Sequence, residues 1–139
     1  NLFRNRWTGS VVDLRNFLMA YIDRPMQWGV DDCSLIIADW WRANHGDDPA
    51  RDIRGTYSDE AGKAAIVDAA GGLLPLVDGL AQSVGASASA ANRDGDFAVL
   101  ALGDGLVSCG IRSGRFWAIR SETGIAFTSN VRVIKGWSI

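Results

Sequence analysis

The hydrophobic and polar residues follow two different periods along the chain. Up to about Val84, apolar residues recur every three or four positions, which is the spacing of amphipathic helices. From about Phe97 onward, short runs of β-branched and aromatic residues alternate with turns of Gly, Asp, Ser and Asn. Helices followed by a small sheet predict an α+β domain, in which N-terminal helices pack on a C-terminal antiparallel β-meander.

Four helices are predicted in the first part of the chain. The first opens at Ser10, where Ser10-Val11-Val12-Asp13 has the form of a capping box, and it stops at Pro25. The second follows Asp31-Asp32 and is apolar on almost every side, which is typical of a buried helix. The third is rich in alanine, begins at Ser58-Asp59-Glu60 and ends at Gly71-Gly72. A short fourth helix carries Leu76, Val77, Leu80 and Val84.

The chain is expected to form a single domain over residues 1–139. Residues 1–9 are predicted to be an N-terminal arm, and the small residues of 85–94 to form a loop between the helical and sheet halves. The roughly 45 residues beyond this loop are too few for an independent core. Five strands are predicted, over residues 97–102, 106–111, 115–119, 125–128 and 131–139.

Composition excludes several classes of function. The formal net charge is −2, with 14 Lys and Arg against 16 Asp and Glu, so the basic surplus that a nucleic-acid binder needs is missing. No apolar run approaches the ~20 residues that span a bilayer, and the N-terminus lacks the apolar core of a signal peptide. With one histidine and two cysteines, neither a metal site nor a disulfide scaffold is expected, and no cofactor is implied.

The segment Gln27-Trp28-Gly29-Val30-Asp31-Asp32-Cys33-Ser34 carries the strongest chemical signal. It places Cys33 in the first turn of the predicted second helix. There, free backbone N–H groups and the positive end of the helix dipole stabilise a thiolate, the nucleophilic form of cysteine. Cysteine is also among the most buried residue types, so Cys33 is either a nucleophile or a small core residue.

This segment has Trp-Gly, then a short polar gap, then Asp-Cys-Ser at the predicted helix start. That order resembles the nucleophile motif of NlpC-type cell-wall peptidases. Gly95-Asp96 before an apolar run also resembles the start of that family's first strand. These enzymes are papain-like cysteine hydrolases that cut peptidoglycan stem peptides. The resemblance implies a papain-like fold, with Cys33 as nucleophile and with Trp28, Gly29 and Asp32 supporting its pocket.

A family of small phage tail proteins, related to these peptidases, is a closer likeness. The resemblance implies an assembly component of a phage tail tip. It also implies a place in the virion after synthesis in the host cytoplasm. The residues that carry the likeness occur in the family's order: Trp28-Gly29, Asp32-Cys33, Ala38-Asp39-Trp40, Gly46, Asp48-Pro49-Ala50, Arg54-Gly55, Tyr57, Gly71-Gly72-Leu73, Gly95-Asp96 and Trp137.

The catalytic partners of the peptidases are missing at the matching positions. Ser108 stands where the family places its histidine, and Trp117 stands where the orienting residue is expected. Neither takes up a proton near neutral pH. His45 follows Cys33 by 12 residues on the same predicted helix, which separates the two by roughly 18 Å. Alternation along the strand would turn Cys109 away from the face on which Ser108 lies.

Two functions are therefore weighed. The first is a structural component of the tail tip, on a peptidase-like fold with a degraded catalytic triad. The alternative is an active cysteine peptidoglycan endopeptidase in which Cys33 is the nucleophile. A more distant third is a module that binds cell-wall peptides without cutting them.

The partners expected from the tail-protein likeness are hub, distal tail or fibre-base proteins, with peptidoglycan as a further possibility. The domain is expected to contact them through its termini and a sheet edge. Trp7 and Trp137 lie near the termini, where a large aromatic either docks the chain end or meets a partner.

Overall fold

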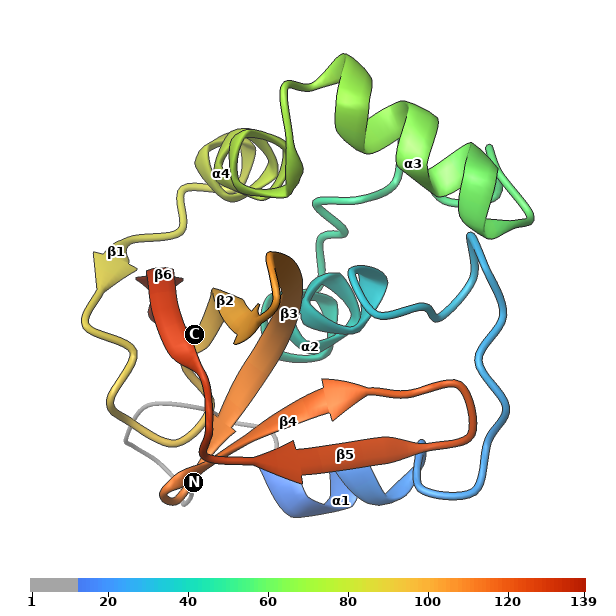
Figure 1. The fold of residues 1–139 in the computed structure, drawn as a ribbon. Helices are drawn as coiled ribbons and strands as arrows, with labels where there is room; N and C mark the ends of the chain where they lie inside the picture. Colours follow the sequence, from blue (N-terminus) through green and yellow to red (C-terminus); the bar gives the residue numbers. More distant parts are fainter. Residues whose placement is uncertain (1–12) are drawn as a thin grey trace.

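A computed structural model describes residues 13–139. Four helices precede a six-stranded antiparallel sheet, so the α+β prediction is confirmed (Figure 1). The helices are α1 (Leu14–Met19), α2 (Leu35–His45), α3 (Glu60–Ala69) and α4 (Leu73–Ser83). The strands are β1 (Ala88–Ser89), β2 (Phe97–Gly103), β3 (Leu106–Ser113), β4 (Phe116–Arg120), β5 (Ile125–Thr128) and β6 (Arg132–Trp137). Ser10 itself and the arm with Trp7 lie outside the described residues. Asp13 is the N-cap of α1 and has an extended backbone, so it is not inside a helix that opens at Ser10 as predicted.

The strand order of the sheet is β1-β6-β2-β3-β4-β5. Strands β2 to β5 form the predicted meander, but β6 returns to pair with β2 instead of extending the meander beyond β5. In this position Trp137 is 2% exposed and stacks on Phe97, with 5.7 Å between the ring centroids. The return of β6 thus buries Trp137, which is not available to a partner. The predicted loop 85–94 contains β1, which pairs with β6.

The helix starts agree with the sequence in one case and differ in another. The side chain of Asp59 caps α3 by accepting the Gly62 N–H at 2.7 Å, as the sequence predicts. Helix α2 begins later than predicted, with Ser34 at its N-cap position. Cys33 therefore lies in the turn before α2, not within its first turn.

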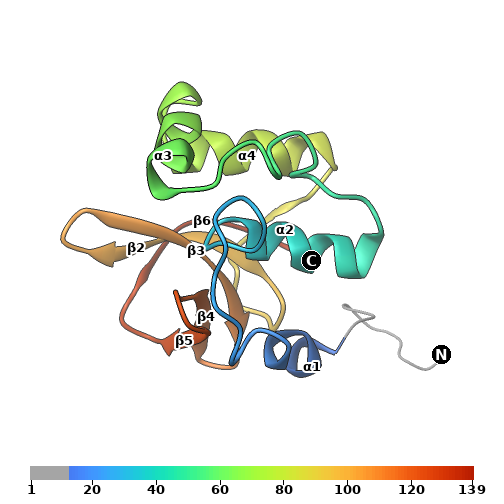
Figure 2. The same cartoon turned by 90° about the vertical axis from the view of Figure 1, so that its right-hand side faces the viewer.

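The core lies on both faces of the sheet. On one face α2 packs against the sheet, with α1 and α4 beside it, and Trp40 and Ile36 are fully buried there. In both views α2 lies between α1 and the α3–α4 pair (Figures 1 and 2). The smaller cluster on the other face is built from Ala91, Ala98, Leu100, Trp117 and Ile119.

Among residues 13–139, no single helix is long and apolar enough to cross a membrane. Helices α3 and α4, bent by 74° at their junction, meet that length and composition only when they are taken together.

Candidate functional site

The turn before α2 is organised around the carboxylate of Asp32. This side chain is fully buried and accepts hydrogen bonds from the backbone N–H groups of Ser34 and Leu35, each at 3.1 Å. It also accepts the Gly29 N–H at 3.0 Å and the Tyr57 hydroxyl at 2.5 Å. One carboxylate thus joins the Trp28-Gly29 loop, the start of α2 and the segment that precedes α3. Asp32 thus holds the backbone of the turn in which Cys33 lies, and none of these bonds reaches the Cys33 sulfur.

Gly29 is required at its position by backbone geometry. Its φ is +79°, and a Cβ built there would lie 2.0 Å from the carbonyl oxygen of Tyr57. The Gly29 carbonyl accepts the Gly55 N–H at 2.9 Å. The close approach of these two loops therefore leaves no room for a side chain.

Arg54 fixes the loop that carries Tyr57 to the rest of the domain. Its guanidinium forms ion pairs of 2.6 Å with Asp39 on α2 and with Asp48, and it donates to the Val30 carbonyl at 3.0 Å. Because all three side chains of the ion pairs are at least four-fifths buried, the pairs are shielded from water. The motif segments that resemble phage tail proteins are thus tied together by polar contacts.

Tyr57 acts as a donor in this network. Burial raises the pKa of its phenol well above the usual range, and the hydrogen bond that the phenol donates to the Asp32 carboxylate raises the pKa further. The phenol therefore stays protonated at physiological pH and is not a base.

The Cys33 side chain is half-buried, and its closest polar contact comes from α3. The Lys63 Nζ lies 2.8 Å from the Cys33 Sγ and 5.6 Å from the centre of the Trp28 ring. A cation beside a cysteine stabilises the anionic form of the sulfur. Sequence reasoning missed Lys63, although a signal was present. It shares the half-buried face of α3 with Ile66 and Val67, where an unpaired lysine would be out of place.

The structure corrects the expectation for Ser108 and Cys109. Cys109 lies with Ile36 and Ile37 in the cluster that joins the sheet to α2. Ser108 pairs with Leu100, whose side chain lies in the cluster on the opposite face, where Trp117 is also buried. Because side chains alternate along a strand, Ser108 and Trp117 point away from Cys33. The position in β3 that faces the start of α2 is Cys109.

Cys109 is not a proton acceptor. Its side chain is fully buried, and burial raises the pKa of its thiol to about 12, although the nearby charge of Lys63 acts in the opposite direction. The thiol is therefore neutral at physiological pH. His45, at the far end of α2, stacks on Trp41 with 3.9 Å between the ring centroids and is remote from Cys33.

A buried arginine at the end of β4 binds the loop that precedes Cys33. Arg120 is 2% exposed and donates to the Asp31 backbone carbonyl at 3.1 Å, and its guanidinium lies 3.3 Å from the Asp31 carboxylate. It also donates to the Gly124 carbonyl at 2.8 Å. The strand pattern predicted β4 but gave no signal that its last residue would be a buried charge.

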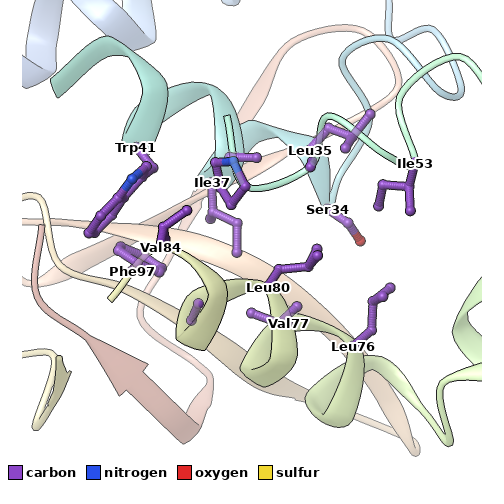
Figure 3. Close-up of a pocket in the computed structure, with 14 residues that line it drawn as sticks. Ser34, Leu35, Ile37, Trp41, Ile53, Leu76, Val77, Leu80, Val84 and Phe97 are labelled. Carbon is purple, nitrogen blue, oxygen red and sulfur yellow. The ribbon is translucent and has the colours of Figure 1, made fainter. Parts of the chain in front are cut away.

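An apolar pocket lies between α2, α4 and the loop around Ile53 (Figure 3). Ser34 contributes the one hydroxyl among the described residues that line it. The side chain of Ser34 points toward the wall formed by α4 (Figure 3). Cys33 and Lys63 do not line this pocket, so the two features are separate.

Comparison with known proteins gives one family match. A model of the family DUF6950, described as a domain of unknown function, matches residues 5–139. No curated protein and no solved structure matches the chain.

Proposed function

The chain belongs to the DUF6950 family. We propose that it is an assembly component of a bacteriophage tail tip, on a papain-like, NlpC-type fold that does not hydrolyse peptides. The likeness to small phage tail proteins is the basis for the tail-tip assignment. Trp28-Gly29, Asp32, Gly55 and Tyr57 carry part of this likeness. The Asp32 carboxylate accepts from Gly29 and Tyr57, and the Gly29 carbonyl accepts from Gly55. These contacts support a structural role for the motif.

The observation that carries the second half of the proposal is the neutral thiol of Cys109 opposite the start of α2. Amide hydrolysis by cysteine needs a group that accepts the thiol proton and returns it to the leaving amine. A peptidase of this kind has a histidine against its nucleophile, and Cys109, which faces the start of α2, cannot serve as that base. Among the described residues, the Lys63 ammonium is the polar side chain in contact with Cys33, and an ammonium donates protons but has no site to accept one.

Exposed apolar side chains at two separate places on the sheet support docking to other tail proteins. Leu106 and Val107, at the turn between β2 and β3, are 63% and 47% exposed, and Phe127 on the edge strand β5 is 48% exposed. Exposed apolar side chains next to an open strand edge are suited to protein contacts. In this proposal, hub, distal tail or fibre-base proteins cover these residues.

The contact between Cys33 and Lys63 favours a second candidate, an active cysteine peptidoglycan endopeptidase. If the Lys63 amine were neutral, it would lie close enough at 2.8 Å to take the proton of the thiol and later to activate water. Lysine serves as the base in some serine hydrolases. This candidate requires both Cys33 and Lys63 for activity.

Virion analysis tests the proposal. Particles of a phage that encodes this chain should contain it in the tail-tip fraction, and deletion of its gene should stop the formation of complete tails. Phages that carry Cys33→Ser or Lys63→Met should assemble and infect like the parent. Particles that lack the protein would refute the tail-tip role. Normal assembly with a shared loss of infectivity in both variants would favour the endopeptidase.

A further inference from the structure

We propose that Cys33 and Lys63 form an acyl-transfer pair. The Cys33 sulfur takes an acyl group from a small acyl thioester, and the Lys63 amine then receives that group and keeps it as an amide. Lys63 is thereby a modification site, and the event occurs once for each molecule. This inference does not depend on the tail-tip role.

The geometry places a second nucleophile next to the first. The Lys63 Nζ is 2.8 Å from the Cys33 Sγ, and the carbonyl carbon of an acyl group on that sulfur would be only one bond away from it. An amine held so close attacks within the same molecule, and effective concentrations of well-oriented groups reach about 10⁵–10⁸ M. Cys33 is only half-buried as a residue, which is consistent with access by a small reagent.

The leaving group decides which substrates this pair can use. A peptide releases an amine, which must receive a proton as the bond breaks. A thioester releases a thiol with an ordinary pKa of about 8.5, which departs as a thiolate without a proton donor. Lys63 is the polar side chain in contact with Cys33 among the described residues, and in this reaction it serves as the acceptor of the acyl group. A thioester, which needs no proton donor for its leaving group, is therefore the acyl donor that suits the site.

The two steps balance without an oxidant or reductant. The Cys33 thiolate attacks the thioester carbonyl, a new C–S bond forms, and the donor thiolate leaves and takes a proton from water. The hydroxide left by that exchange takes a proton from the Lys63 ammonium, and the resulting neutral amine attacks the same carbonyl carbon. A C–N bond forms, the C–S bond to Cys33 breaks, and the proton lost by nitrogen ends on the Cys33 sulfur.

The chain contains its own control for each residue. Lys63 and Lys135 are the only lysines in the sequence, and Cys33 and Cys109 are the only cysteines. Lys135 also lies 5.6 Å from a tryptophan ring centre, that of Trp137, but its partner at 2.6 Å is an Asp78 carboxylate and not a thiol. The two lysines therefore differ in the partner of the amine, which is a sulfur for Lys63 and a carboxylate for Lys135.

The experiment treats the full chain with S-acetyl-N-acetylcysteamine, a small acetyl thioester, and follows each residue by peptide mass spectrometry. Acetyl-Cys33 should appear first and decay as acetyl-Lys63 rises, and Lys63 should be acetylated at least about tenfold faster than Lys135. The product should resist neutral hydroxylamine, which cleaves thioesters but not amides. These measurements on the unaltered protein need no variant.

Variants then separate the two steps. Cys33→Ala should slow Lys63 acetylation to the rate of Lys135, whereas Cys109→Ala should leave the Lys63 rate unchanged. Lys63→Arg should trap the acetyl group on Cys33 as a hydroxylamine-sensitive thioester. Thermal melts verify that each variant is folded.

Four results would overturn the proposal. These are equal acetylation of the two lysines, Lys63 acetylation that is independent of Cys33, a Cys33 thioester that persists in the unaltered protein, or release of free acetate in place of the amide. The last result would indicate hydrolysis and would favour the endopeptidase. The first three leave the tail-tip role untouched.

Discussion

Replacing Tyr57 with phenylalanine removes one hydroxyl from the network around Asp32. The hydroxyl donates to a carboxylate that is fully buried, and the tyrosine itself is 9% exposed. The ring is retained in the variant, so the change in packing is small. The main effect is the loss of one hydrogen bond to a buried carboxylate, which keeps its three backbone N–H donors.

A hydrogen bond to a charged group contributes about 1.5–3 kcal/mol to stability. We therefore expect Tyr57→Phe to lower the free energy of unfolding by about 1.5–3 kcal/mol, a change of about 10- to 150-fold in the unfolding equilibrium. Tyr21→Phe is the matched control. The Tyr21 hydroxyl donates to Asp39 at 2.7 Å, but the charge of that carboxylate is balanced by the Arg54 guanidinium at 2.6 Å, whereas Asp32 has no ion-pair partner among the described residues. The expected loss for Tyr21→Phe is therefore only about 0.5–1.5 kcal/mol.

Urea unfolding followed by tryptophan fluorescence measures both variants against the parent. The midpoint should fall further for Tyr57→Phe than for Tyr21→Phe, with an unchanged dependence of the unfolding free energy on urea. A loss below about 0.5 kcal/mol for Tyr57→Phe would refute the claim that Asp32 and Tyr57 organise the turn before Cys33.

Three further predictions test the same region. Gly29→Ala should lower the free energy of unfolding in urea by at least about 3 kcal/mol, because its Cβ would clash with a backbone oxygen. Gly46→Ala, with φ +90° and open space around it, should lower it by only about 1–2 kcal/mol, and equal losses would contradict the clash. Arg54→Met removes the closer of the two arginines that pair with Asp39 and Asp48, since Arg42 lies 3.9 and 3.6 Å from these carboxylates, and it should cost about 3 kcal/mol. Arg51→Met at an exposed ion pair should cost less than about 0.5 kcal/mol, and similar losses would contradict this reasoning. Above about pH 10 the unfolded chain loses phenol protons that the folded chain retains, so the free energy of unfolding should fall as pH rises, by up to about 1.4 kcal/mol per pH unit for one tyrosine. The fall should be shallower in Tyr57→Phe. The same slope in the parent and the variant would contradict a raised pKa at Tyr57.

The features that sequence predicted well depend on neighbouring residues. The start of α3 follows from the cap at Asp59, because a capping side chain and the N–H group that it binds are three residues apart. The strands β2 to β5 follow from local runs of β-branched and aromatic residues between turns. The pairing of β6 with β2 joins distant segments, and no local pattern identifies the partner of a strand.

The site was predicted less completely than the fold. The motif predicted Cys33 in the first turn of the helix, but Cys33 lies in the turn before α2. Whether Ser108 or Cys109 faces this turn depends on which face of β3 meets α2. A shift of one residue reverses that face, and the sequence around Gly110 contains no residue that fixes it. The contact of Lys63 with Cys33 joins residues 30 positions apart and arises only when α3 packs beside the turn.

Digestion of purified peptidoglycan sacculi tests most directly whether the domain has lost hydrolysis. The unaltered protein, Cys33→Ala and Lys63→Met are incubated with sacculi, and released stem peptides are quantified by mass spectrometry against an active cysteine endopeptidase. We predict that all three samples release no more fragments than buffer alone. Release by the unaltered protein that disappears in both variants would contradict the account and identify Cys33 and Lys63 as the catalytic pair of a peptidase.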